Sequence, residues 1–253
     1  MLTWKAIAPL CLLPLLGLAS PSAALADPDA LSKIVIGKCV PAEQASSTPG
    51  PCKLVDLAGR YAVLKDLVGK TQYLLIPTDR VEGIEAPEIG QANAPDYFED
   101  AWEARRFMDE SFGNPIPRDD VGLAINSMKG RSQNQFHIHI DCVRPDVLKT
   151  LAGDEAAIGT QWAPLPAPLL GHPYLAMRLE APDLAKTNPF ALLASQVPDA
   201  GKDMGDETLV AVATTFSDKQ NGFYLLSDRV DALHADLASG EELLDHSCTV
   251  LGQ

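Results

Sequence analysis

The chain has 253 residues, and its 20 Lys and Arg against 34 Asp and Glu give a formal net charge of −14. Hydrophobic residues make up 46 % of it and charged residues 21 %, which is too apolar for a disordered protein and ordinary for a globular one. The acidic balance excludes a general nucleic-acid-binding protein, because binding to phosphate backbones needs a basic face.

Residues 1–26 have the layout of a secretory signal peptide. Lys5 makes the start positive, an apolar stretch follows, and Ala24-Leu25-Ala26 is a cleavage pattern of small residues. Three prolines interrupt the stretch and disfavour a stable membrane-spanning helix. An uncleaved N-terminal anchor is the alternative. We expect export to the periplasm or to the outer face of an inner membrane, with residues 27–253 as the mature chain.

The cysteines agree with export. Cys11 lies in the predicted signal peptide, which leaves Cys39, Cys52, Cys142 and Cys248. An even count in an oxidising compartment favours two disulfides, and three connectivities are open. Cys39 and Cys52 bracket a loop rich in Pro, Ser and Ala, which suits a local bridge between them. Cys142 would then pair with Cys248. A metal site is the alternative, although no pair has C-x-x-C spacing.

Periodicity and turn residues predict mostly short elements in the first half of the chain. In chain order they are a helix at 29–36, a loop at 41–51, a strand pair at 61–65 and 72–76, a loop at 78–95, an amphipathic helix at 96–112 that ends at Gly113, and strands at 121–125 and 135–143.

The second half is less regular. It predicts a wrapped loop at 161–172, strands at 175–179, 208–216 and 222–227, a helix at 189–197 with Asn188 as its N-cap, and helices at 228–238 and 240–245. The sum is an α+β protein with a mainly antiparallel sheet.

One segment carries chemistry. Alternation in the predicted strand at 135–143 places Gln135, His137, His139 and Asp141 on one face, with apolar residues on the other. A plain solvated strand face is one interpretation. A His-x-His metal pair is another, although only three further histidines exist and no H-x-x-x-E lies nearby. The third is acid–base or covalent catalysis by histidine.

The residues just before this strand suit an anionic ligand. Gly130-Arg131-Ser132 predicts a turn whose backbone N–H groups would cradle an anion. Asn126, at the end of the preceding strand, is placed to orient a ribose or phosphate oxygen.

Together these motifs resemble a known family. The stretch 126–147, NSMKGRSQNQFHIHIDCVRPDV, is similar to the signature of CDP-diacylglycerol pyrophosphatases of the histidine-triad (HIT-like) superfamily. Further similarity lies at 61–66, 72–78, 171–176 and 245–248, so it covers nearly the whole mature chain and all four of its cysteines. The resemblance implies one HIT-like catalytic domain over 27–253, an antiparallel sheet with flanking helices and a C-terminal extension.

The resemblance also implies the catalytic roles. The superfamily pattern is His-x-His-x-His with a Ser three residues before it, which from Ser132 aligns Gln135, His137 and His139. His137 then takes the nucleophile position and His139 the leaving-group position. Gln135 departs from the pattern, since it cannot titrate, but its side chain can still orient His137 by a hydrogen bond. A competing register starts at His137 and makes His139 the nucleophile; the Ser132 spacing favours the first.

The implied reaction is hydrolysis of CDP-diacylglycerol to CMP and phosphatidate through a cytidylyl-histidine intermediate, with no metal or cofactor. The partners are this lipid nucleotide and a membrane surface. Alternatives are a metal-dependent phosphohydrolase using the His-x-His pair, or a non-catalytic nucleotide-binding module. Expected substrate contacts are Lys65 and Arg131 for the pyrophosphate, Asn126 for the nucleotide, and Ser132, Gln72 and His172 in the pocket. The stretch 164–170 is a candidate for acyl-chain contact, or a loop packed on the core.

Overall fold

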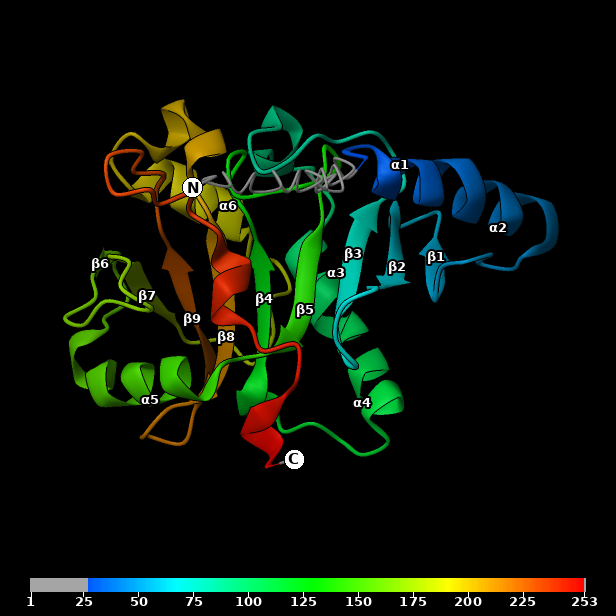
Figure 1. Cartoon of the computed structure of the whole chain (residues 1–253). Coiled ribbons are helices and arrows are strands. Elements are labelled where there is room, and N and C mark those ends of the chain that lie inside the picture. The colour runs from blue at the N-terminus through cyan, green and yellow to red at the C-terminus, as the bar shows by residue number, and fades with distance from the viewer. Residues whose placement is uncertain (1–26, 253) are drawn as a thin grey trace, which may run out of the picture.

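The computed structural model describes residues 27–252, so the predicted signal peptide and Cys11 lie outside the described residues. An antiparallel sheet of nine strands runs through it in the order β1-β2-β3-β5-β4-β8-β9-β7-β6 (Figure 1). The strands are β1 (Leu54–Asp56), β2 (Tyr61–Lys65), β3 (Tyr73–Pro77), β4 (Val121–Ile125), β5 (Ile138–Cys142), β6 (Ala163–Pro164), β7 (Leu175–Leu179), β8 (Leu209–Thr215) and β9 (Asn221–Ser227).

Helices cover both faces of this sheet. They are α1 (Ala30–Ile34), the π-helical η1 (Val35–Cys39), α2 (Val40–Ser46), α3 (Tyr97–Ala104), α4 (Arg106–Phe112), α5 (Pro145–Asp154) and α6 (Pro189–Gln196). Single 3₁₀ turns are η2 (Pro87–Gly90), η3 (Arg118–Asp120), η4 (Glu155–Ala157), η5 (Ala200–Lys202), η6 (Met204–Asp206), η7 (Gly240–Leu243) and η8 (Thr249–Leu251). The α+β class is confirmed.

The largest apolar core lies on one face of the sheet. It joins α3, α4 and α6 through Phe98, Phe107 and Phe190 to alternate strand residues such as Ile138 and Ile140. This is the apolar side of the Gln-x-His-x-His segment, as alternation predicted.

The opposite face carries two separate apolar clusters. One joins α1 and η1 to β2 and β3, and the other joins α5 to β4, β8 and β9. His139 pairs with Leu74 of the first cluster and Ala124 of the second. The polar face of β5 therefore lies in the gap between two helix-covered regions, and η7 contacts β4 and β8 beside it.

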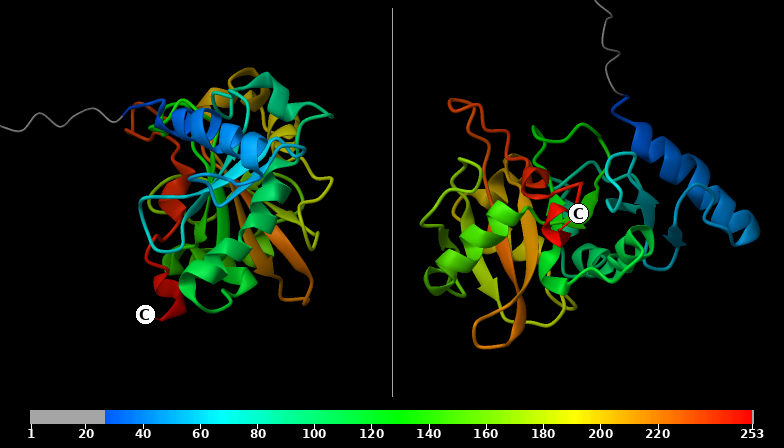
Figure 2. Two further views of the ribbon diagram at one scale, coloured as in Figure 1. Left: turned by 90° about the vertical axis from the view of Figure 1, so that its right-hand side faces the viewer. Right: turned by 60° about the horizontal axis from the view of Figure 1, so that its bottom comes forward.

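Several element predictions need correction. The segment expected as a loop at 41–51 begins as helix, because η1 passes directly into α2 and forms one rod with α1 (Figure 2). Pro41 fits there at the start of α2. The helix α5 was not predicted, and the amphipathic helix at 96–112 is interrupted at Arg105.

The predicted helix at 228–238 is wrong. Asp231 accepts from Leu233 N and Asp236 accepts from Ala238 N, and the segment forms turns. Short carboxylate side chains that bond nearby backbone N–H groups compete with a helix in this way. By contrast, Asn188 accepts from Ala191 N at 3.1 Å, as expected of an N-cap.

Two disulfides join Cys39 to Cys52 and Cys142 to Cys248. This is the connectivity in which the first pair forms the local bridge. Disulfides indicate an exported protein. Within residues 27–252, no helix has the length and apolar character that crossing a bilayer requires.

Candidate active site

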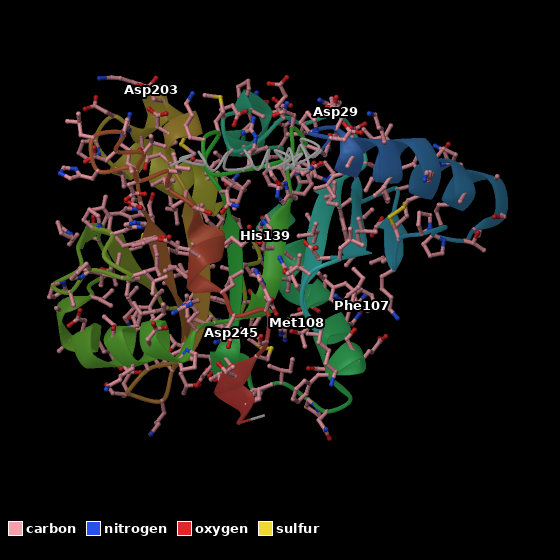
Figure 3. The ribbon with its side chains drawn as sticks, viewed as in Figure 1. Asp29, Phe107, Met108, His139, Asp203 and Asp245 are labelled. Carbon is pink, nitrogen blue, oxygen red and sulfur yellow. A yellow bond between two sulfur atoms is a disulfide. The ribbon has the colours of Figure 1, made fainter. Side chains whose placement is uncertain are left out.

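A cavity of about 700 Å³ lies over the gap between the two clusters, and His137 and His139 line it together. Asn126, Ser132 and Glu241 line the same cavity. Figure 3 shows His139 near the middle of the sheet. Three segments of the chain, before β5, in β5 and in η7, thus meet at one place.

His137 is fixed by the backbone. Its Nδ1 lies 2.7 Å from the carbonyl oxygen of Gln135. A carbonyl only accepts, so Nδ1 carries the proton and the neutral ring keeps its lone pair on Nε2. Burial lowers the pKa of His137 below its ordinary value of 6.5, which favours this neutral form near pH 7. A neutral ring with a free Nε2 lone pair has the form that a nucleophile needs.

His139 is held differently. Gln72 Nε2 lies 2.8 Å from His139 Nδ1 and also donates to Glu241 Oε1 at 3.2 Å. With Nδ1 accepting, the proton of the neutral ring lies on Nε2, an atom that is buried and has no hydrogen-bond partner within residues 27–252. Burial first, then His137 and His246, hold the pKa of His139 well below 6.5. His139 is thus ready to donate a hydrogen bond.

The two imidazoles lie side by side. Their ring centroids are 4.8 Å apart and their planes make an angle of 67°. A phosphoryl group in contact with His137 Nε2 would lie within reach of a hydrogen bond from His139. This pairing of nucleophile and donor suits an in-line displacement at phosphorus.

Glu241 organises the site, and the sequence analysis missed it. Its backbone N–H donates to Asn126 Oδ1 at 3.0 Å, and Asn126 Nδ2 donates to Glu241 Oε2 at 3.2 Å. Gly240 lets η7 approach β8, since a Cβ there would lie 2.5 Å from Val210 Cγ2. Glu241 stands in an acidic C-terminal stretch with no motif around it, so no local signal distinguishes it.

His246 completes this network. Its Nδ1 lies 2.8 Å from Asp141 Oδ2, and its Nε2 lies 3.5 Å from Glu241 Oε1. The hydrogen bond with Asp141 raises the pKa of His246 and favours its charged form. Glu241 therefore lies between a cationic His246 and the neutral His139.

We expect Glu241→Ala to lower kcat/KM by about 100-fold, because Gln72 and Asn126 lose their common partner and the reacting groups shift. Glu241 also acts to raise the pKa of His137. Its loss should therefore move the acid side of the pH–rate profile to lower pH while the plateau rate falls. Glu241→Gln keeps one acceptor oxygen and should restore part of the rate. A lower rate with an unmoved profile and no rescue would contradict this positioning role.

Gln135 acts through its main chain. Its side-chain Nε2 donates to the carbonyls of Asp79 at 2.8 Å and Pro77 at 3.4 Å, away from His137. The expected side-chain hydrogen bond to His137 is replaced by the Gln135 carbonyl. Gln135 therefore anchors the loop after β3 and presents the carbonyl that orients the His137 ring.

The two expected cations are engaged elsewhere. Arg131 forms a two-bond ion pair with Glu85, both N–O distances being 2.6 Å, and its side chain is 6 % exposed. Lys65 lines the cavity, but its Nζ donates to the carbonyls of Asp66 and Gly69, each at 2.9 Å. Arg131 is a structural residue here, and Lys65 holds the β2–β3 turn.

Two other residues and one segment that were expected in the pocket also lie outside the cavity lining. Gln72 contacts His139 and Glu241 but is not itself part of the cavity lining. His172 binds Glu242 Oε1 at 2.7 Å, where Tyr174 OH also donates, and lies outside the cavity lining. The stretch 164–170 does not line the cavity either, and its Leu165 and Leu169 pack in the apolar cluster with α5, which favours the alternative of a loop packed on the core.

The pH dependence of the rate follows from His137. If His137 is the nucleophile, its attacking form is the neutral ring, and burial lowers the pKa of His137 below 6.5. Lowering the pKa keeps the ring neutral to more acid pH, so kcat/KM should stay level from pH 8 downward and fall only below 6.5. A series of initial rates in overlapping buffers tests this. An acid limb centred above 6.5 would contradict it.

One comparison with known proteins bears on this site. The family model described as CDP-diacylglycerol pyrophosphatase matches residues 26–252.

Proposed function

Because the chain belongs to the CDP-diacylglycerol pyrophosphatase family and hydrolyses the pyrophosphate bond of CDP-diacylglycerol, we propose that it does so through a covalent bond to His137. His137 Nε2 attacks the α-phosphorus of the CMP half. The N–P bond forms while the bond from phosphorus to the bridging oxygen breaks. Phosphatidate leaves with that electron pair.

The second half-reaction consumes water. A water oxygen attacks the cytidylyl phosphorus, the N–P bond breaks, and its electron pair returns to His137 Nε2. CMP takes the water oxygen, and the protons of water pass to the two phosphate products and the solvent. The sum is CDP-diacylglycerol and water giving CMP and phosphatidate.

The observation that carries this mechanism is the hydrogen bond from His137 Nδ1 to the Gln135 carbonyl. It leaves Nε2 free to attack and stabilises the positive charge that the ring carries while phosphorus is attached. His139 Nε2–H stabilises charge on the phosphoryl or leaving oxygen. The His137-first register is also supported, since in the other register the attacking His139 would carry its proton on Nε2 and its lone pair on Nδ1, which faces Gln72.

We place the chain in the histidine-triad superfamily on the same grounds, with Gln135 in the first triad position and residues 27–253 as one catalytic domain. The antiparallel sheet that holds His139 in its middle supports this placement. The disulfides support residence in the periplasm or at the outer face of an inner membrane, after cleavage of a signal at 1–26 or with that segment kept as an anchor. The membrane surface is the expected source of substrate.

A rapid-quench experiment tests the mechanism. Enzyme is mixed with CDP-diacylglycerol labelled in the α-phosphate, in EDTA, and quenched in base, where phosphoramidates survive. We expect labelled protein with CMP attached at His137 by mass spectrometry, formed before steady-state release of CMP. Turnover in EDTA with no labelled protein, or turnover only without EDTA, would contradict the covalent mechanism. The second result would favour a metal-dependent enzyme, and binding with no turnover a non-catalytic module.

A further inference from the structure

The catalytic cavity has walls of two different characters. His137, His139, Asn126 and Glu241 form its polar side. The remaining lining residues come mainly from α1, β2, β3 and the turn between these two strands. Six of them are large and apolar, namely Leu31, Ile34, Leu64, Leu67, Val68 and Leu74, and these six form the apolar wall; Lys38 of η1, Lys65 and Asp66 lie among them.

The β2–β3 turn exposes its apolar side chains. Leu67 is 101 % exposed and Val68 is 56 % exposed. Seven large hydrophobic residues within 27–252 are exposed, and only these two line the catalytic cavity. An adjacent pair of exposed apolar side chains at the edge of a substrate cavity differs from the single exposed leucines that are normal on protein surfaces.

The turn is also built to hold these side chains in place. Lys65 Nζ bonds the carbonyls of Asp66 and Gly69, and Asp66 Oδ1 accepts from Val68 N at 3.0 Å. Gly69 has φ of +70° and lies against His246, where a Cβ would come within 2.8 Å. The tip with Leu67 and Val68 is thus attached to the same network that holds the catalytic histidines.

We propose that the apolar wall, with Leu67 and Val68 at its outer edge, binds the diacylglycerol end of the substrate. This rests on the function above, which puts the pyrophosphate at His137 and His139. The diacylglycerol is covalently attached to that pyrophosphate, so it must leave the histidines through this cavity. A volume of about 700 Å³ suits the headgroup and the first part of the chains, and the rest passes Leu67 and Val68.

The test uses the double variant Leu67→Ser/Val68→Ser and two soluble substrates. CDP-dihexanoylglycerol, kept below its critical micelle concentration, has short acyl chains, and CDP-glycerol has none. Leu233→Ser is the matched control, because Leu233 is 94 % exposed and lies outside the cavity lining. CDP-glycerol is scored by turnover or, if it is not hydrolysed, by its inhibition constant.

We expect the double variant to lose about tenfold or more in kcat/KM for CDP-dihexanoylglycerol, the loss expected when apolar side chains no longer cover the chains. Its kinetics with CDP-glycerol should match the wild type, and Leu233→Ser should match on both. Equal values on the acyl substrate would overturn the proposal, as would an equal loss on both substrates. A loss seen only with substrate in vesicles would show that the turn binds the membrane and not the substrate. Failure of the His137 mechanism would show separately, as a missing CMP adduct in the wild type.

Discussion

Replacing His137 by alanine is expected to lower hydrolysis of CDP-diacylglycerol by roughly 10⁴-fold or more, because the first step loses its nucleophile. His137 is 6 % exposed and its ring bonds a main-chain carbonyl, so a circular dichroism spectrum of the variant checks that it remains folded. Steady-state release of CMP and quench-trapped adduct are measured together, and both should vanish. In His137→Gly, added imidazole should restore part of the CMP release, since it enters the space left by the ring.

The matched control is His234→Ala, which removes a histidine whose side chain is 80 % exposed and pairs with Asp231. It should retain full activity. His139→Ala is informative in a different way: it should slow adduct formation by roughly 10²–10³-fold, the loss typical of one donor to a developing oxyanion, while CMP still attaches to His137. If His139→Ala abolished the adduct and His137→Ala retained it, the competing register would be correct.

The second large effect concerns stability. Replacing Cys142 and Cys248 by serine should lower the free energy of unfolding by about 4–5 kcal/mol in the chain-entropy account, because their bridge spans 106 residues. Both cysteines are buried. Urea denaturation followed by circular dichroism, with linear extrapolation, measures the change. Activity should also fall, because this bridge holds the C-terminal segment that brings His246 to Asp141.

The other disulfide serves as the control. Cys39 and Cys52 are separated by 13 residues, so their replacement by serine should cost about 3 kcal/mol. Asp141 and His246 do not depend on that bridge, so kcat should change little in the folded variant. An equal or greater loss of stability in Cys39→Ser/Cys52→Ser would contradict the expected dependence on loop length.

Parts of the fold follow from local patterns. The strands at 61–65, 121–125 and 175–179 match β2, β4 and β7, because alternation and turn residues are local properties of the chain. The strand predicted at 135–143 is shorter, since β5 begins at Ile138. Residues 135–137 leave the sheet, and this is what turns the Gln135 carbonyl toward His137.

Some expectations about side chains also follow from local spacing in the sequence. The sequence alone singled out the Gln-x-His-x-His segment as the candidate site of chemistry, since histidines two residues apart in an extended segment point to one side. Among three open connectivities it also favoured the pairing of the cysteines that the structure shows. Both conclusions need only spacing and count.

Only the tertiary structure decided which groups surround the histidines. Arg131 pairs with Glu85 across 46 positions, and Glu241 meets Asn126 across 115. Neither partner is marked locally, because an arginine or a glutamate looks the same in sequence whether it faces solvent, an ion-pair partner or a substrate. The folded chain pairs the buried Arg131 with Glu85 and brings Glu241 to the histidines, since burying a charge costs free energy unless an opposite charge or hydrogen bonds lie beside it.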